Sequence, residues 1–532
     1  MFVADFYLRF MKRRNFLKRT LAGAAVASAG AAFRGNLFAL EPEKVLTLGG
    51  TSAASLDHYT RMFPGLRRKS SRPFVDIEEG LTKLGEAMVD ADPPVEPENQ
   101  PDLPTAGYTY FGQFIDHDLT LDLTPLEHVP ATVEEIPNFR TPVLDLDNLY
   151  GGGPSLSPFL YERGSRRAER FLIGKTTPDD LPNDLPRNEQ GIALVADPRQ
   201  DENLIIAQLH LAFLKLHNLV IARRGEMDAS PHYRRACATD FAAAQRVVRW
   251  HYQYAIRNDF LPRLLDEGVV EELPSLETWA RRSAGRKVGI PVEFSAAAFR
   301  FGHSMVRDIY KSINSHQEDV TLASLLERTG AHGGAAPRLP TEWVVDWDRF
   351  FEIPPNTSHL SSIRKIDTQI ALGLHELKEP TVKHFNVLPR DEIPQPRLPV
   401  RTLLRGHRLG LPSGEDLAEH LLHDKPSVRR LKEDEIVAGP QAHILTDRRY
   451  GFRRQTPLWY YILKEAEVLH NGRRLGPVGS YIVALVLLRA LAGAEDSYVS
   501  APDWRPTLDG GDAVSMGRIL QFVIGASTGS NT

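Results

Sequence analysis

The chain has 532 residues, of which 42% are hydrophobic and 25% charged, so it is long enough and apolar enough to bury a large core. Its formal net charge of −4 at pH 7 gives no basis for electrostatic binding to nucleic acid. Cys237 is the single cysteine, which excludes an intramolecular disulfide framework and a thiolate-rich metal site. Metal or cofactor chemistry therefore has to rest on His, Asp, Glu and Arg.

Residues 1–40 have the pattern of an export signal. The paired Arg13 and Arg14 are followed by Asn-Phe-Leu-Lys and then by a short, alanine-rich apolar run over residues 21–32. Paired arginines in this context resemble a twin-arginine signal, which predicts a bacterial protein exported to the periplasm or secreted. The apolar run is short for a membrane span, so we expect none once the signal is removed.

Residues 41–107 are predicted to form an extended arm, because the stretch from Asp92 onward is rich in proline and acid. A helix is predicted to follow over residues 108–120. Its Gln113 and His117 are one turn apart, and Asp116 lies about 60° to the other side of Gln113. These three side chains would converge on one buried pocket, although the pattern alone also fits a core histidine at a helix end.

The loop from Thr141 to Asp147 carries hard oxygen donors on alternate residues. In an extended backbone, Thr141, Val143, Asp145 and Asp147 face the same side. Hydroxyl, main-chain carbonyl and carboxylate oxygens suit calcium, although a solvated Asx-rich turn has the same composition. Asp118, which points away from the predicted pocket, is available to a different partner.

The rest of the chain shows helical spacing of apolar residues and few strand signals, which predicts a mainly α-helical protein. Helices are expected over residues 204–223, 240–265, 294–313 and 481–491, with a polar helical stretch up to residue 431. Arg199 and Glu202 precede the first of these helices. Without a functional role, they would form a capping or surface ion pair there. In the third, Arg300 lies one turn before His303, and Gly302 would let a flat ligand approach the backbone.

Taken together, these segments resemble the animal-type haem peroxidases of the peroxidase–cyclooxygenase superfamily, which include myeloperoxidase and lactoperoxidase. The resemblance extends over residues 100–500 and keeps the family order of motifs. The motifs are Gly112–Asp118, Thr141–Asp147, Arg199–Glu202, Phe299–His303, Leu404–Gly406 and the helix containing Val478 and Gly479. The resemblance implies one large helical domain, residues 108–525, with haem between a distal and a proximal helix.

The resemblance also implies a catalytic set and its activity. His117 corresponds to the distal histidine, Arg199 to the distal arginine, and Gln113 to the residue that orients distal water or a halide. With these residues the expected reaction is reduction of hydrogen peroxide coupled to oxidation of a halide, thiocyanate or a small aromatic donor.

On the proximal side, the resemblance assigns His303 as the haem iron ligand and places Arg300 and Arg405 at the haem propionates or haem edge. The family has an asparagine as hydrogen-bond partner of the proximal histidine, and Thr402 occupies that position here. A threonine hydroxyl would accept this hydrogen bond, but more weakly than an amide oxygen does. The alternative is that the partner of His303 lies elsewhere in the fold.

Two further features follow from the resemblance. Asp116 and Glu202 match the carboxylates that form ester bonds to haem b, whereas Asn203 replaces the methionine that makes a third bond in some members. At most two ester links are therefore expected. Asp118, together with the donors of the Thr141–Asp147 loop, matches the family's calcium site.

Two alternatives remain open on the sequence, one from the same superfamily and one from a different class of protein. A fatty-acid oxygenase of the same superfamily would have a tyrosine where this chain has Arg300. A calcium-dependent binding or adhesion protein would keep the fold and lose the chemistry. A zinc hydrolase has little support, because His375-Glu376 lacks the second histidine of the His-Glu-x-x-His motif.

Overall fold

The computed structural model describes residues 57–66, 73–90, 100–124, 132–164, 169–223, 225, 232–233, 237, 239–283, 289–329, 338–355, 359–377, 397–425, 428–508 and 515–529. The predicted export signal, residues 1–40, lies outside this part of the chain.

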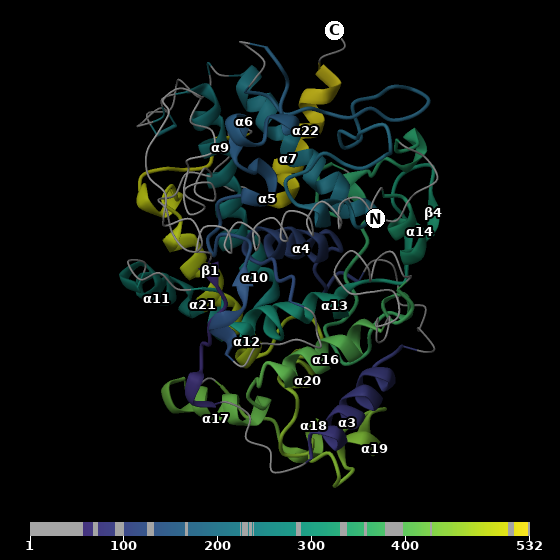
Figure 1. The fold of residues 1–532 in the computed structure, drawn as a ribbon, viewed down its shortest axis with the longest axis vertical. Helices are drawn as coiled ribbons and strands as arrows, with labels where there is room; N and C mark the ends of the chain where they lie inside the picture. The colour runs from purple at the N-terminus through teal and green to yellow at the C-terminus, as the bar shows by residue number, and fades with distance from the viewer. Residues whose placement is uncertain are drawn as a thin grey trace, which may run out of the picture.

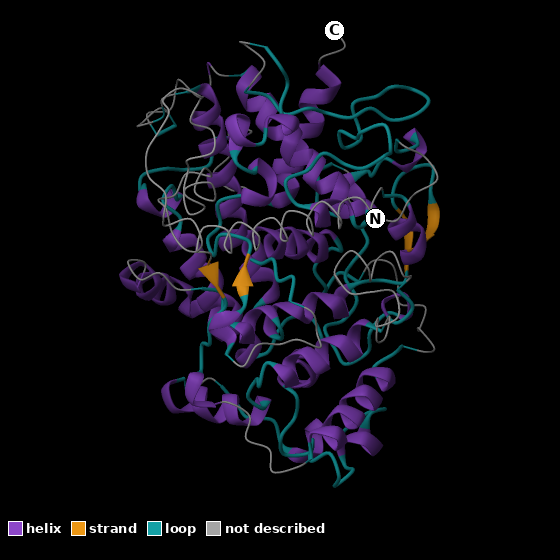
Figure 2. Ribbon diagram, viewed as in Figure 1, coloured by secondary structure: helices purple, strands orange, loops and turns teal. Residues whose placement is uncertain are grey.

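Helices dominate the described chain, and the strands are confined to two short antiparallel pairs (Figure 2). The helices are α3 (Phe74–Ala87), α4 (Gly107–Leu119), α5 (Asp147–Tyr150), α6 (Gly153–Leu156), α7 (Leu204–Ala222), α9 (Asp240–Ala255), α10 (Leu261–Leu264), α11 (Glu267–Ser283), α12 (Val292–Ser295), α13 (Gly302–Met305), α14 (Leu322–Glu327), α16 (Leu398–Arg408), α17 (Gly414–Asp424), α18 (Glu433–Ile436), α19 (Ala442–Leu445), α20 (Leu458–His470), α21 (Pro477–Gly493) and α22 (Met516–Gly529). Strand β1 (Asp57–His58) pairs with β2 (Pro137–Asn138), and β3 (Ile309–Ser312) pairs with β4 (Glu318–Thr321). The predicted mainly α-helical fold is confirmed.

Helix α4 lies near the middle of the molecule (Figure 1) and forms where the sequence predicts it. Two of its aromatic side chains, Phe111 and Phe114, are buried against α7 and α9. Phe114 stacks on Phe213 of α7 with ring centroids 4.7 Å apart, and Phe111 meets Tyr252 of α9 edge-on at 6.1 Å. Burying each such side chain contributes roughly 1.5–3 kcal/mol, so the aromatic face fixes the rotation of α4 and with it the direction of its polar residues.

Helix α7 is the long apolar core helix predicted over residues 204–223. Asn203 caps it by accepting a hydrogen bond from the backbone N–H of Ile206 at 3.0 Å. By length and composition α7 could cross a membrane, but 83% of its most apolar window is buried inside the protein. Burial of that kind is typical of a core helix.

The single helix predicted over residues 294–313 is wrong. The chain instead forms α12, a short 3-10 helix η7 (Ala298–Phe301) and α13, and then strand β3. Ala297 has φ −141° and ψ −73°, which interrupts the helix, and Val306 has extended angles after α13. The isoleucine and tyrosine residues that follow favour a strand, and the buried Tyr310 hydroxyl lies 2.8 Å from that of Tyr110.

The arm predicted over residues 41–107 is not extended throughout, because Phe74–Ala87 forms α3. Ile77, Leu81 and Leu84 recur at helical spacing and are buried, and α3 packs against α16. This amphipathic pattern overrides the polar composition of the flanking residues.

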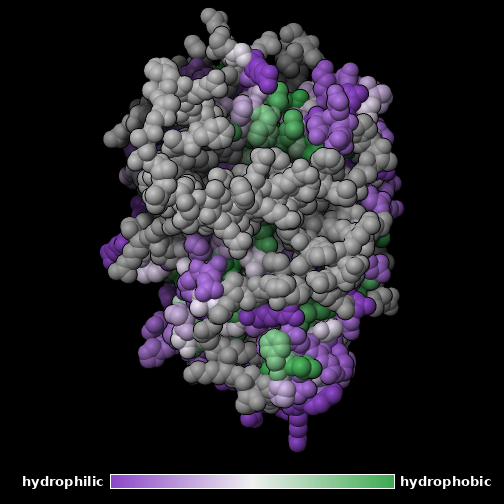
Figure 3. Space-filling model, in the orientation of Figure 1, coloured by the Kyte–Doolittle hydropathy of each residue, from purple (hydrophilic) through white to green (hydrophobic). Residues whose placement is uncertain are grey.

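The apolar helix predicted near the C-terminus is confirmed as α21, which begins at Pro477. The buried Glu465 of α20 accepts a hydrogen bond from the N–H of Val478 at 3.0 Å and so caps its first turn. On the face drawn in Figure 3, the described surface is mainly hydrophilic with small hydrophobic patches, and the large apolar helices lie inside.

Candidate functional site

A cavity of about 400 Å³ lies between α4 and η5 (Pro198–Asp201) on one side and η7, α13 and α16 on the other. All the predicted catalytic and haem-binding residues except Thr402 line it: Gln113, Asp116, His117, Arg199, Glu202, Arg300, His303 and Arg405. These residues come from segments up to 292 positions apart (from 113 to 405), so the fold has brought the separate motifs to one place.

His117 projects from the last turn of α4 and is only 4% exposed. Burial, followed by the charge of Arg199, holds the pKa of His117 well below its usual range. The imidazole is therefore neutral at pH 7 and able to accept a proton. Its Nε2 lies 3.7 Å from Oε1 of Glu202.

Arg199 is held rigidly by Asp197, the N-cap residue of η5. The backbone N–H, Nε and Nη2 of Arg199 donate to the Asp197 carboxylate at 2.9, 3.1 and 2.7 Å. Nη2 also donates to the main-chain oxygens of His117 and Thr120 at 3.1 and 2.6 Å. A guanidinium fixed in this way is pre-organised to stabilise negative charge in the cavity.

Asp197 joins Arg199 to a second arginine that the sequence did not single out. Arg140 donates to Asp197 Oδ2 from Nε and Nη2 at 3.0 and 2.7 Å. The two arginines keep the pKa of the fully buried Asp197 well below its usual range even though burial alone would raise it. Arg140 also lies 3.5 Å from Oδ1 of Asp147, which connects the distal arginine to the acidic loop.

Two carboxylates on the cavity wall are held in a poorly solvated environment. Burial raises the pKa of Glu202 to about 8, and burial also raises the pKa of Asp116. Glu202 accepts a hydrogen bond from Nε2 of Gln113, and Asp116 accepts one from the Thr120 hydroxyl at 3.0 Å. Both carboxylates are placed to react with, or bind, a ligand in the cavity.

The proximal wall bears on the two possibilities that the sequence left open for the hydrogen-bond partner of His303. Thr402 is buried on α16, and its hydroxyl accepts a hydrogen bond from Nη1 of Arg300 at 3.4 Å. Nδ1 of His303 is buried and has no hydrogen-bond partner among the described residues. Thr402 is thus not the partner of His303 in this structure, and its hydroxyl is hydrogen-bonded to Arg300 instead. The indole of Trp459 packs against the His303 ring at 6.2 Å.

Arg405 is held by protein groups at the mouth of the cavity. It donates to the carboxylate of Asp122 and, from Nη1, to the main-chain oxygen of Thr124 at 3.2 Å. Asp122 and Tyr59, which is buried beside strand β1, complete this part of the wall. The sequence did not indicate either residue, because their nearness to Arg405 depends on long-range packing.

The residues present fit a flat, anionic, iron-containing group. His303 offers a partly buried imidazole on one wall, and two arginines, Arg300 and Arg405, line the same cavity. A Cβ atom added at Gly302 would meet nothing within 4 Å, so there is open space beside the backbone next to His303. The neutral His117 and the charged Arg199 stand on the other wall. This donor set matches haem with an imidazole ligand.

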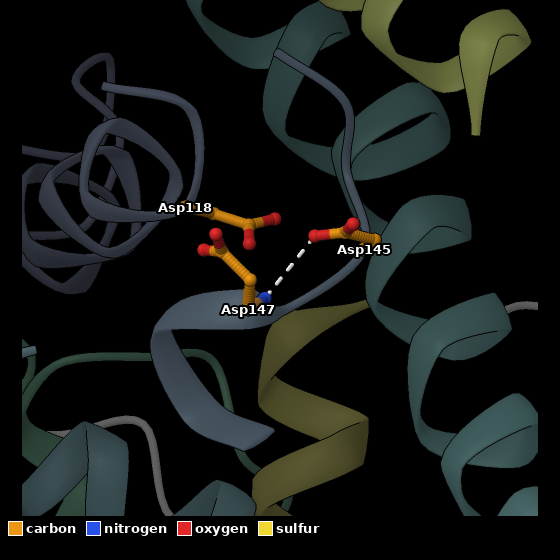
Figure 4. A group of neighbouring side chains, drawn as sticks. All are labelled: Asp118, Asp145 and Asp147. Atoms are coloured by element: carbon orange, nitrogen blue, oxygen red, sulfur yellow. Dashed lines mark hydrogen bonds between the residues drawn. The ribbon is translucent and has the colours of Figure 1, made fainter. Parts of the chain in front are cut away.

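The acidic loop forms the second predicted site (Figure 4). Oxygens of Asp118, Asp145 and Asp147 lie within 4.8 Å of one another, and the three side chains point toward one another. Burial raises the pKa of Asp118 well above its usual range, and the other two carboxylates raise it further. Such mutual repulsion is relieved by a bound cation.

Thr141 and Val143 belong to the same loop. The Thr141 hydroxyl donates to both carboxylate oxygens of Asp145 at 3.0 Å, and the Val143 carbonyl accepts from the N–H of Asp145 at 3.1 Å. All five predicted oxygen donors thus come from α4 and one short loop. This set is suited to calcium, which takes carboxylate, hydroxyl and carbonyl oxygens.

Comparison with known proteins shows what the chain is similar to. Residues 126–330 match the animal haem peroxidase family, a segment that contains Arg199, Glu202, Arg300 and His303. The chain is 25% identical over 188 residues to the peroxidase skpo-1 of Caenorhabditis elegans, a match that covers 35% of this chain and 26% of that protein. The chain thus spans about a quarter of the length of this curated relative.

Two solved structures share the fold. Peroxidase A from Dictyostelium discoideum superimposes with a TM-score of 0.53 at 16% identity, covering 84% of this chain and 88% of that chain. The fatty acid alpha-dioxygenase of Oryza sativa gives a TM-score of 0.53 at 13% identity, covering 84% of this chain and 77% of that chain. The predicted resemblance is confirmed at this level: residues 126–330 match the animal haem peroxidase family, and the described chain has the fold of a solved peroxidase.

Proposed function

We propose that the protein is a haem-dependent peroxidase that reduces hydrogen peroxide and oxidises a halide, thiocyanate or a small organic donor. The observation that carries this proposal is that a neutral histidine, a fixed arginine and a second histidine all line one cavity. When bound, haem b supplies the iron centre at which the oxygen–oxygen bond is broken. The donor supplies the two electrons that convert the peroxide into water.

In this proposal His117 transfers the proton and Arg199 stabilises the negative charge. Neutral His117 accepts a proton from one peroxide oxygen and returns it to the departing oxygen, which leaves as water. Arg199 stabilises the negative charge that develops as the bond breaks, and Asp197 keeps its guanidinium in place. His303 would ligate the iron, while Arg300 and Arg405 would bind the propionates. Asp116 and Glu202 would form the ester links, if any form.

A pair of histidine variants tests these roles. His303→Ala should abolish stable haem binding, which the Soret absorbance of the purified protein measures. His117→Ala should retain haem but react with peroxide about 10²–10⁴-fold more slowly in stopped-flow experiments. Replacement of the exposed His443 by alanine is the matched control and should change neither property. A His117→Ala protein that reacts at the parent's rate would refute the role given to His117.

The acidic loop supports a second part of the proposal, a calcium site that ties α4 to the loop. Asp118, Asp145, Asp147 and Thr141 would supply side-chain oxygens and Val143 its carbonyl. We further propose that residues 108–525 form the catalytic domain and that the export signal delivers the folded protein to the periplasm or outside. Loss of export in a host that lacks the twin-arginine translocase would support that route, and unchanged export would refute it.

A fatty-acid oxygenase is the second candidate, favoured by the apolar part of the cavity. Val306, Leu322, Leu326, Leu374 and Leu377 line that part. Oxygen uptake on addition of a long-chain fatty acid, without peroxide turnover, would favour this candidate. Peroxide-dependent donor oxidation without oxygen uptake would favour the peroxidase.

A further inference from the structure

The helix cap of α7 determines how the amide of Asn203 is oriented. The Asn203 Oδ1 accepts a hydrogen bond from the N–H of Ile206 at 3.0 Å. Only an oxygen can accept from that N–H group, so the amide nitrogen has to point the other way. Asn203 Nδ2 donates to Oε1 of Gln113 at 3.2 Å.

The orientation of Gln113 follows from that of Asn203. Because Oε1 of Gln113 faces a donor, its Nε2 is the end that contacts Glu202. The same Oε1 atom of Glu202 that accepts from Gln113 lies 3.7 Å from Nε2 of His117. The Gln113 amide nitrogen, rather than its oxygen, therefore lies on the side of the catalytic imidazole.

The order of these contacts does not depend on the charge of Glu202. Burial raises the pKa of Glu202 to about 8, so its protonation changes near neutral pH. A protonated Glu202 could donate to a carbonyl oxygen and would then favour a flipped Gln113. The Asn203 amide prevents this flip, because its own oxygen is committed to the helix cap.

We propose that Asn203 is a positioning residue that holds an N–H group of Gln113 toward small anions in the distal cavity. This inference rests on the proposed haem peroxidase function and extends it to the choice of ligand. An amide N–H attracts an anion such as a halide, whereas an amide oxygen in the same place repels it. Gln113, Asn203 and Arg199 line the same cavity, and Arg199 Nη1 makes no hydrogen bond to the described residues.

Two substitutions separate this role from the helix cap. Asn203→Asp and Asn203→Ser both keep an oxygen that caps α7, but neither offers an N–H to Gln113. The aspartate places a second acceptor against Oε1 of Gln113 and so forces the amide to turn. The serine leaves the Gln113 amide free to take either orientation. Folding of both proteins is checked by circular dichroism and by the Soret band after haem loading.

Fluoride is the probe, because it is an anion that only accepts hydrogen bonds. Its dissociation constant is measured from the absorbance change of the ferric, haem-loaded protein. Loss of one charge-assisted hydrogen bond should weaken fluoride binding about tenfold in Asn203→Asp, and less in Asn203→Ser. In the ferrous carbon monoxide complex, the C–O stretching frequency should rise in Asn203→Asp, because an N–H dipole near the ligand has been replaced by a carbonyl oxygen.

A Gln113→Leu background tests whether Asn203 acts through Gln113. There, Asn203→Ser should have no further effect on fluoride binding. Equal effects in both backgrounds, or fluoride affinity at the parent's value in Asn203→Asp, would overturn the inference while leaving the peroxidase proposal intact. A parent protein that forms no Soret band when haem is supplied would overturn both.

Discussion

Asp197→Asn is the substitution that most directly tests how the distal arginine is held. Asp197 is fully buried and accepts hydrogen bonds from Arg199 and Arg140 at 2.7–3.1 Å. Asparagine keeps the volume but leaves two adjacent guanidinium groups without their carboxylate. Removing one partner of a buried ionic pair costs about 3–5 kcal/mol, because an uncompensated buried charge remains. We expect the free energy of unfolding to fall by that amount.

Asp496→Asn is the matched control. Asp496 also accepts hydrogen bonds from two arginines, Arg246 and Arg249, at 2.9 and 3.2 Å, but its side chain is 26% exposed. Solvent screens this cluster, so its loss should cost about 1 kcal/mol or less. Urea titrations of the haem-free proteins, compared at equal denaturant slope, measure both values. Equal losses in the two variants would show that burial does not set the strength of the Asp197 cluster.

The pH dependence of the Asp197 variant has a defined sign. The arginines depress the pKa of Asp197 in the folded protein, so its stabilising contribution is complete above the unfolded pKa of about 3.9. The difference between the parent and Asp197→Asn should be constant from pH 7 to pH 5 and shrink below about pH 4. In the haem-loaded variant, peroxide activation should slow by about 10², because Arg199 is no longer fixed. A difference that grows on acidification would contradict the ionised state of Asp197.

Three further predictions test other parts of the structure. Gly302→Ala should leave the haem-free fold unchanged but weaken haem binding in a haem titration, because the new Cβ would enter the open space beside His303. Gly65→Ala is the control: its Cβ also meets nothing within 4 Å, and it should leave haem binding unchanged. Saturating calcium at about 100 times its dissociation constant should stabilise the parent by about 2.7 kcal/mol in urea titrations, and Asp118→Asn should lose most of this gain. Nε2 of His251 accepts a hydrogen bond from the N–H of Thr507 at 3.0 Å, and burial lowers the pKa of His251 to about 4. The contribution of neutral His251 to the free energy of unfolding is therefore complete above about pH 6.5 and is lost as the pH falls toward 4. The stability gap between the parent and His251→Gln should therefore narrow by about 1.4 kcal/mol per pH unit in that window, and a constant gap would refute the neutral state of His251.

The local features of the fold were predictable because they depend on short-range spacing. The apolar pattern of α7 and the aromatic run of α4 mark both helices in the sequence, and their bounds agree with the structure within about two residues. The break between α12 and η7 was not predictable, because it depends on the backbone angles of Ala297. The strand that follows α13 is set by the pairing of β3 with β4. The buried stripe of α3 was present in the sequence, and the surrounding polar residues obscured it.

The residues of the cavity also divide into features that the sequence predicts and features that it does not. The residue types at positions 117, 199 and 303 predict peroxidase chemistry, because their order along the chain resembles that of one family. The residues that hold Arg199 were not visible in the sequence, because neither Asp197 nor Arg140 belongs to any of the motifs. The Thr402 hydroxyl was one of two possibilities for the partner of His303, and in the structure it accepts from Arg300. The choice between them depends on side-chain packing. Such contacts follow from tertiary structure alone.

The absorbance spectrum of the protein purified with haem supplied, before and after one equivalent of hydrogen peroxide, tests the central claim most directly. If the cavity holds haem on His303 with His117 and Arg199 opposite, the ferric protein should show a Soret band that shifts on addition of peroxide. A folded protein that binds calcium but shows no Soret band would contradict the enzyme assignment and favour a binding or adhesion protein that has kept the fold.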